Sequence, residues 1–423
     1  GEMALSVRLL LAILIAVFSS SIAVAGETLT TVAEWAVLNY TWDDAHTYAD
    51  YVDSGKFEPS NCLMAGINVG RDGDIYVTVP RWRNGVPATL NKLERSTSYA
   101  SYTLTPFPSW DMQREGVDGD LQSCQSMTID TKNRMWVIET GRRNFFSPIK
   151  RQWVDGAAGV WIIDLNTNEI VSKYYFPEDV ASYDGSYVND IVLDEKRGLA
   201  YLSDAWGEGG IIVYDAVAGT SKRFTGASTT NDPTYDMIIN GNDYGTNIFT
   251  TPSDGIAFVD DGGDAAAAVF YSAVQGTTLY RLSAERLQAF LEGTATSADL
   301  DAAVQVIGTK NPSDGMKYLP SAGRLYYGDL PNSTYWYVPI NATSFPDLRT
   351  EAVMATPPDA SRLGWVDTFA VDLSTSTSTT GAPQKLYFVS NKLDLFATMK
   401  MDFSGNSGAN MHVLCSDSGA ALN

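Results

Sequence analysis

A hairpin pattern that recurs along the chain constrains its fold most strongly. In the clearest copy, residues 186–204, alternating apolar residues lead into a charged turn at 194–198, and a second β-forming run follows. Similar units begin at Gly66, Ser126, Ser186, Ser253, Ser313 and Asp367, roughly 50 to 65 residues apart. With two further strands per unit, this repeat predicts an all-β fold, a six-bladed β-propeller. An irregular β-sandwich is the alternative.

The repeat also predicts where a functional site lies. The first strand of each propeller blade lines the central channel, so polar residues at the starts of these strands converge at one end of it. These residues are Asn189, Asp190, Asp254, Asp314 and Asp367. We expect this ring to bind a ligand, with Trp82 and Tyr327 as aromatic residues near the channel.

Three kinds of chemistry fit such a ring. Carboxylates beside aromatic rings bind a cationic amine, because opposite charges attract strongly in a low-dielectric channel. Oxygen ligands at Asn189, Asp254 and Asp314 would instead hold Ca²⁺, which polarises a carbonyl or activates water. Crowded carboxylates would raise one pKa and let that group move a proton. The structural alternative is that these side chains only cap the strands and hold the blades in register.

Composition limits the partners. The 423 residues include 29 Lys and Arg against 50 Asp and Glu, a formal net charge of −21. We therefore expect neither nucleic acid nor an anionic membrane as a partner, and small cations or metal ions fit better. The charge alone would also keep an extracellular protein soluble.

The N-terminal residues predict secretion. Residues 3–25 combine a basic residue, a short apolar run and a small-residue cleavage site, which indicates a signal peptide. We expect residues 1–25 to be this peptide with two upstream residues, 26–403 to form the propeller and 404–423 to form a C-terminal tail. No later apolar run is long enough to cross a membrane. Residues 32–40 are expected to complete the last blade, and 411–414 to form a final strand.

Cysteine and histidine content narrows the chemistry further. The three cysteines allow one intrachain disulfide at most, and we expect Cys62 to pair with Cys124 because each precedes a first strand. With only two histidines, a His-ligated zinc site or a Ser-His-Asp triad is not expected. N-glycosylation sequons begin at Asn39, Asn332 and Asn341.

One loop carries a distinctive motif. Residues 79–90 read VPRWRNGVPATL, with Trp82 between two arginines after the end of a strand. Such a loop suits a ligand anion or a stacked ring, or a structural latch between blades, which we favour.

This motif resembles a signature of the Yellow/major royal jelly protein family. Residues 107–110, 133–141, 200–214 and 269–287 are similar, in order, to further family motifs. Glu139 replaces an Asp of the family pattern, Ala273 stands where Pro is frequent, and this chain has fewer cysteines than is usual. The resemblance therefore implies a distant member.

The resemblance implies a secreted six-bladed propeller whose relatives convert dopachrome, bind biogenic amines or serve nutritive and structural roles. We therefore expect a secreted protein that binds a small cationic or aromatic ligand, of biogenic amine or catechol type, in its channel. A dopachrome-conversion-like tautomerase activity is compatible with this expectation, and no catalytic residue is carried over.

Two alternatives remain. Residues 188–190, 252–255 and 312–316 resemble first-strand motifs of Ca²⁺-dependent lactonase propellers of the gluconolactonase type. The runner-up function is such a hydrolase. The other alternative is a structural or nutritive extracellular protein.

Overall fold

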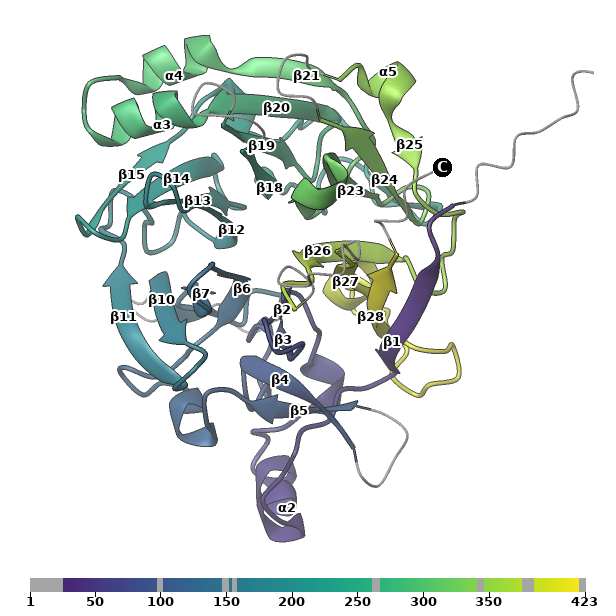
Figure 1. Ribbon diagram of the computed structural model, residues 1–423. Helices are drawn as coiled ribbons and strands as arrows, with labels where there is room; N and C mark the ends of the chain where they lie inside the picture. The colour runs from purple at the N-terminus through teal and green to yellow at the C-terminus, as the bar shows by residue number, and fades with distance from the viewer. Residues whose placement is uncertain are drawn as a thin grey trace, which may run out of the picture.

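The computed structural model describes residues 26–96, 102–146, 152–153, 158–260, 267–340, 346–374 and 384–417. It confirms the six-bladed β-propeller: six four-stranded sheets stand around a central channel (Figure 1). The expected signal peptide lies outside the described residues, so secretion stays a prediction. Within the described part of the chain, no helix is long and apolar enough to cross a membrane.

The first three blades follow each other along the chain. Their strands are β2 (Ile67–Val69), β3 (Ile75–Thr78), β4 (Leu90–Arg95) and β5 (Tyr102–Pro106); β6 (Cys124–Ile129), β7 (Arg134–Glu139), β10 (Gly159–Asp164) and β11 (Glu169–Tyr175); and β12 (Val188–Asp194), β13 (Leu199–Asp204), β14 (Gly210–Asp215) and β15 (Thr220–Phe224). In each blade the first strand of the sequence unit is the innermost strand, as the repeat predicts.

The last three blades complete the ring. Their strands are β18 (Ser253–Val259), β19 (Ala268–Ala273), β20 (Thr278–Ser283) and β21 (Gln305–Thr309); β22 (Met316–Leu319), β23 (Arg324–Asp329), β24 (Thr334–Pro339) and β25 (Val353–Met354); and β26 (Trp365–Val371), β27 (Leu386–Asn391), β28 (Met411–Ser416) and β1 (Leu29–Trp35). Two-stranded pairs join β8 (Arg142–Arg143) to β9 (Gln152–Trp153) and β16 (Ile238–Ile239) to β17 (Asn242–Asp243).

Short helices occupy the connections. They are α2 (Ala45–Asp53), α3 (Ala284–Leu291), α4 (Ser297–Ala303), α5 (Leu348–Glu351) and α6 (Leu393–Ala397), with 3-10 turns η1 (Pro59–Asn61), η2 (Trp110–Gln113), η3 (Ala227–Thr229) and η4 (Pro320–Ala322). The side chain of Ser283 caps α3 by accepting from the backbone N–H of Arg286. Helix α2 projects from the ring beside β4 and β5 (Figure 1).

The two ends of the chain close the ring in one sheet. β1 pairs antiparallel with β28, with Leu29 opposite Ser416 and Trp35 opposite Met411. The expected completion of the last blade by an N-terminal strand is therefore confirmed, with the strand at 29–35. β28 confirms the final strand expected at 411–414, and the last blade thus includes residues that we had assigned to a tail.

At two places the backbone at the start of an innermost strand comes close to the backbone of the next blade. A Cβ on Gly255 would lie 2.2 Å from the backbone oxygen of Asp314, and one on Gly315 would lie 2.2 Å from that of Asp367. Glycine is required at both positions because any side chain would overlap the neighbouring strand. These Asp-Gly pairs hold blades close together and do not form hairpin turns.

The loop after β3 is a latch between blades. The buried guanidinium of Arg81 donates to five backbone oxygens, those of Val86, Pro87, Gln113, Leu121 and Gln122. Arg83 donates to the backbone oxygen of Phe396 and lies over its ring, 3.7 Å from the centroid. The two arginines therefore tie the first blade to the second and the last, which is the favoured structural interpretation of this motif.

Candidate functional site

A β-bulge aims the polar pairs of four innermost strands at the channel. In β12, Val188 pairs with Asp204 and Ile191 with Leu202, so Asn189 and Asp190 together lie opposite one residue. The same shift follows Ser253 in β18, Cys124 in β6 and Val366 in β26. Bulges commonly re-aim side chains in this way. The polar residues at the strand starts therefore coincide with a β-bulge that recurs in four innermost strands.

These bulges build a pocket of about 90 Å³ at the strand-start end of the channel. Four residues predicted from the sequence line its base: Asn189, Asp254, Asp314 and Asp367. Half of the other lining residues are aromatic: Trp82, Phe145, Phe146, Tyr187, Trp206, Phe249 and Trp365. We call this the aromatic pocket.

Each carboxylate at the base has a defined partner. The Asn189 amide donates to Asp254 Oδ1 at 2.7 Å. The Trp365 indole donates to Asp314 Oδ2 at 2.6 Å. The Asn391 amide donates to Asp367 Oδ2 at 2.8 Å. No described lysine or arginine makes a salt bridge with these three aspartates.

Burial and mutual repulsion raise the pKa values of this group. The pKa of Asp254 lies well above its usual range because the carboxyl is buried and because Asp314 and Asp367 are near. Burial likewise raises the pKa of Asp314 and of Asp367, and Asp314 also repels Asp367. Asp254 and Asp314 therefore titrate as a pair, because the protonation state of each carboxyl affects that of the other.

The aromatic wall is held by hydrogen bonds and ring contacts. The Trp82 indole donates to the Tyr187 hydroxyl at 2.6 Å, and that hydroxyl donates to Gln125 Oε1 at 2.7 Å. The ring of Phe145 packs 4.9 Å from that of Trp206, centroid to centroid. Trp82 is therefore a fixed part of the pocket, as the sequence placed it near the channel.

Two expected members lie elsewhere. The Asp190 carboxylate turns away from the aromatic pocket and accepts from Ser126 Oγ at 2.8 Å, because the bulge separates it from Asn189. Burial raises its pKa to about 6. Tyr327 is on the second strand of its blade and lines a separate cavity with Lys310, whose ammonium is 5.8 Å from the ring centroid. Tyr327 therefore does not line the aromatic pocket, because a second strand lies behind the first.

Most of the aromatic residues that line the pocket were not predicted from the sequence. Phe145, Phe146 and Phe249 come from connections between strands, where no periodic pattern marks them. Trp365 offered a signal, since it lies two residues before Asp367 in the sixth unit. Trp206 similarly follows the end of β13 by two residues.

Calcium at Asn189, Asp254 and Asp314 stays a prediction. Among the described residues no group of three or more His, Cys, Asp or Glu side chains is arranged to hold a metal ion. The Asn189 amide also donates to the carboxylate that would be its fellow ligand.

The cysteines and sequons are placed as follows. Cys62, Cys124 and Cys415 are buried and free, so the expected Cys62–Cys124 disulfide is absent from the structure. Burial raises the pKa of the Cys124 thiol. Asn39 and Asn332 are exposed, whereas Asn341 lies outside the described residues. Glycosylation stays a prediction.

The fold and site define a class: a six-bladed propeller with an aromatic-walled, carboxylate-based pocket at one channel mouth. The family described as "Major royal jelly protein" matches residues 122–413. The chain belongs to this family. The resemblance to the Yellow/major royal jelly protein family that the sequence indicated is thereby confirmed.

Curated relatives match at low identity. Dopaminechrome tautomerase of Drosophila melanogaster is 28% identical over 217 residues, 48% of this chain and 44% of the relative. Major royal jelly protein 1 of Apis mellifera is 25% identical over 276 residues, 62% of this chain and 59% of the relative. Protein yellow of Drosophila madeirensis is 28% identical over 222 residues, which cover 51% of this chain and 38% of the relative. The matches therefore span less than two thirds of each relative.

Solved structures share the general arrangement only. A luciferin-regenerating enzyme aligns over 92% of this chain and 95% of its own, with 12% identity and a TM-score of 0.48. Regucalcin of Agrobacterium tumefaciens, described as calcium-binding, aligns over 84% of this chain and 91% of its own, with 9% identity and a TM-score of 0.46. At these scores neither likeness bears on function.

Proposed function

We propose that the aromatic pocket binds a small cationic or aromatic molecule of the biogenic amine or catechol type. We further propose that its carboxylates move a proton on an aminochrome ring. The observation that carries the proposal is the cluster of buried Asp254, Asp314 and Asp367 in one pocket with an aromatic wall. The match to a dopaminechrome tautomerase supports the same chemistry.

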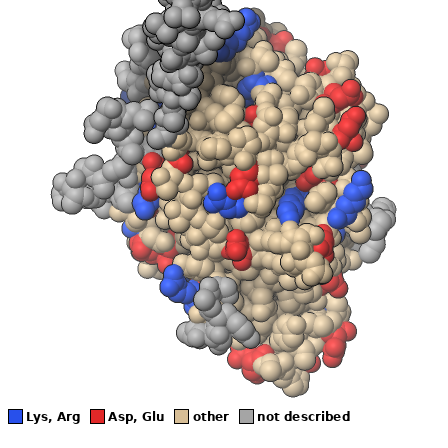
Figure 2. Space-filling model, turned by 90° about the vertical axis from the view of Figure 1, so that its right-hand side faces the viewer, with Lys and Arg blue, Asp and Glu red and all other residues tan. Residues whose placement is uncertain are grey.

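Binding follows from charge and ring contacts. A ligand ammonium would meet ionised carboxylate at the base, while its ring packs against Trp82 or Trp365. The face of the molecule in Figure 2 shows acidic and basic side chains interspersed, without a large acidic patch. Selectivity for a cation is therefore assigned to the buried pocket and not to this face.

Proton transfer follows from the unequal protonation of the carboxyls. A tautomerisation removes a proton from one ligand atom and returns a proton to another, so its atoms balance without a co-reactant. Within the pair of Asp254 and Asp314, a protonated carboxyl is suited to give a proton to a carbonyl oxygen, and an ionised carboxyl is suited to take one from carbon. Such general acid–base groups contribute about 10²- to 10⁴-fold to a rate.

The pocket is narrow for this ligand. Its volume of about 90 Å³ is below the roughly 300–1,000 Å³ of typical small-molecule sites. A bicyclic ring therefore requires the side chains at the mouth to move. Ile248, which is exposed, and the edge-on pair Phe145 and Phe146 lie at the pocket's rim.

The test follows dopaminechrome by the loss of its visible colour, and dopamine binding by calorimetry. Asp254→Asn should lower the enzymatic rate about 10²-fold or more. Asp190→Asn, a buried channel carboxylate outside the pocket, should change the rate only a few-fold. Equal rates for wild type and Asp254→Asn contradict the catalytic role, and saturable dopamine binding without turnover leaves a binding protein.

A further inference from the structure

The opposite end of the channel contains a second, larger cavity of about 420 Å³. Innermost strands of four blades line it, through Thr128 on β6, Val192 on β12, Phe258 on β18 and Lys317 on β22. The turn at 194–196 forms its rim. We call it the lysine cavity. It is separate from the aromatic pocket, which lies at the starts of the same strands.

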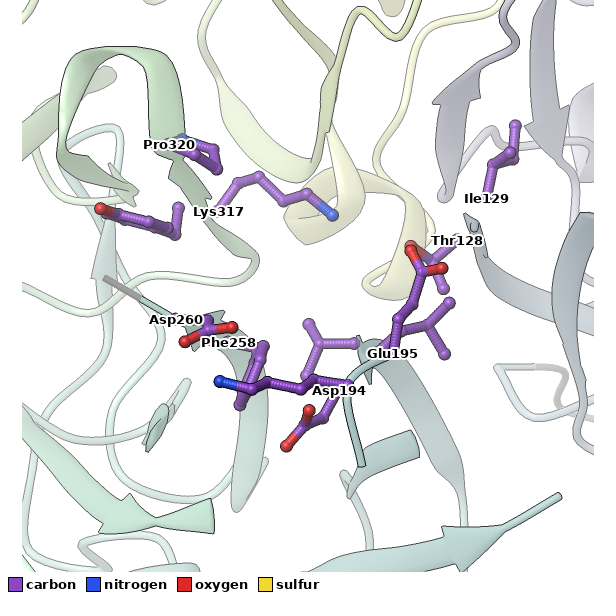
Figure 3. Close-up of a pocket in the computed structure, with 12 residues that line it drawn as sticks. Thr128, Ile129, Asp194, Glu195, Phe258, Asp260, Lys317 and Pro320 are labelled. Carbon is purple, nitrogen blue, oxygen red and sulfur yellow. The ribbon is translucent and has the colours of Figure 1, made fainter. Parts of the chain in front are cut away.

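Lys317 is the unusual group in this cavity. Its side chain extends toward the middle of the space (Figure 3). It makes no hydrogen bond and no salt bridge with any described residue. The negative charge of Asp190 favours the charged form of Lys317. The two side chains form no salt bridge with each other. Burial opposes that charge and lowers the Lys317 pKa.

Two of the three acidic residues that line the cavity, Asp194 and Glu195, already have partners. Asp194 accepts from Arg197 at 2.9 Å in a salt bridge. Glu195 accepts from the backbone N–H of Thr131 at 3.0 and 3.1 Å, and from its hydroxyl. Asp260 is exposed at the edge. Lys196 also lines the cavity. Lys317 is half-buried and makes no hydrogen bond to a described residue, so its ammonium is available to an anion.

The rest of the lining selects the body of the ligand. Ile129, Val192, Phe258 and Tyr318 provide apolar and aromatic surface beside the ammonium. A compact carboxylate with an aromatic or aliphatic body matches this arrangement, since its charge meets Lys317 and its body contacts the apolar lining. The carboxylates of Asp194 and Glu195, which already accept from other residues, would repel a ligand with several negative charges.

We propose that the lysine cavity is a binding site for a small aromatic or aliphatic monocarboxylate, whose carboxylate pairs with Lys317. This site is independent of the aromatic pocket and of the function proposed for it. It gives the channel two mouths with opposite ligand preference: cations at one end and monoanions at the other.

Calorimetry with two matched probes tests the proposal. Folded full-length protein is titrated with 4-hydroxyphenylacetate and with its uncharged amide, 4-hydroxyphenylacetamide. The carboxylate should bind saturably and at least about tenfold more tightly than the amide, a difference of 1.4 kcal/mol. Equal affinities, or no saturable binding of the carboxylate, overturn the proposal without any variant.

Variants then assign the binding to the cavity. Lys317→Met should weaken carboxylate binding at least about tenfold, with the thermal midpoint showing that the variant is folded. Lys400→Met removes the same charge from an exposed residue outside the cavity and should leave the affinity unchanged. Loss of affinity in Lys400→Met to the same degree as in Lys317→Met, or unchanged affinity in folded Lys317→Met, overturns the assignment.

Discussion

Two clusters of buried charge lie at the same end of the propeller and differ in how their charges are balanced. In the latch, Arg81 donates to five backbone oxygens, and Glu139 accepts from the backbone N–H groups of Gln122, Ser123 and Gly141. At the base of the aromatic pocket, Asp254, Asp314 and Asp367 carry charges of one sign without a salt-bridged cation.

The difference separates structure from chemistry. A buried charge with a full set of hydrogen bonds and an opposite charge nearby stabilises the fold once formed, and removing one partner is costly. Crowded like charges do the reverse, because each carboxylate makes ionisation of the next more difficult. We therefore expect changes in the two clusters to alter stability in opposite directions.

The largest effect is expected in the latch. Arg81→Met leaves five backbone oxygens without their donor and removes the positive charge near the buried Glu139, so the free energy of unfolding should fall by about 3–5 kcal/mol. Chemical denaturation measures it. Arg83→Met, which loses one backbone hydrogen bond and a ring contact, should cost less. A loss below about 1 kcal/mol in Arg81→Met would show that the latch is dispensable.

The contact between blades should respond next. In Gly315→Ala the new Cβ would lie 2.2 Å from the backbone oxygen of Asp367, and relieving this overlap should cost about 1–3 kcal/mol. It should also weaken dopamine binding, because Asp314 precedes the displaced strand. Gly276→Ala is the control, since its Cβ would meet Ala273 at an ordinary 3.5 Å. Equal denaturation midpoints for the two variants would contradict this packing argument.

The third effect concerns pH. Burial raises the pKa of Asp190 to about 6, so the folded state binds a proton that the unfolded state has already released. This contribution is present below the unfolded pKa of about 4 and is lost as pH rises to about 6, at a rate of at most about 1.4 kcal/mol per pH unit.

Asp190→Asn removes this titration, and the fall in stability between about pH 4 and pH 6 should become shallower. Thermal midpoints across that range check the slope. A wild-type stability that rises through this window, with the same slope in Asp190→Asn, would contradict the raised pKa.

The smallest expected change in stability comes from a substitution at the base of the aromatic pocket. Asp254→Asn removes one of the crowded carboxyls and keeps a hydrogen-bonding side chain beside Asn189. At pH 7 we expect the free energy of unfolding to stay the same or to rise by about 1 kcal/mol, while dopaminechrome conversion falls. A clear loss of stability would instead place this cluster with the latch as a structural element.

Local pattern was enough to predict much of the fold. The alternating runs around 188–192 and 253–259 and their spacing predicted six blades, and the position of Asp254, Asp314 and Asp367 within the units predicted that they meet. Both inferences depend on strand periodicity, which is a local property of the chain. The propeller fold in turn predicted that an N-terminal segment, expected at 32–40 and found at 29–35, completes the last blade.

The errors arose where neighbours along the chain are separated in space. Asn189 and Asp190 are adjacent in the chain. The bulge nevertheless directs the Asn189 amide to the aromatic pocket and the Asp190 carboxylate to Ser126. The sequence suggested equivalent places for Cys62 and Cys124 before first strands, yet Cys124 is the first residue of β6, Cys62 precedes β2, and both are free. Backbone irregularities and pairing between blades are set by packing, which periodicity does not report.

The sequence by itself determined the number of blades, the strands that face the channel and the residue types at its ends, because these follow from a short repeated pattern. Only the tertiary structure decided which charges are balanced. Arg81 and Lys317 are both basic residues in or beside strands, and one is surrounded by backbone oxygens while the other extends into an open cavity. That distinction depends on which atoms of distant segments come within hydrogen-bonding distance, and it separates the latch from the two proposed sites.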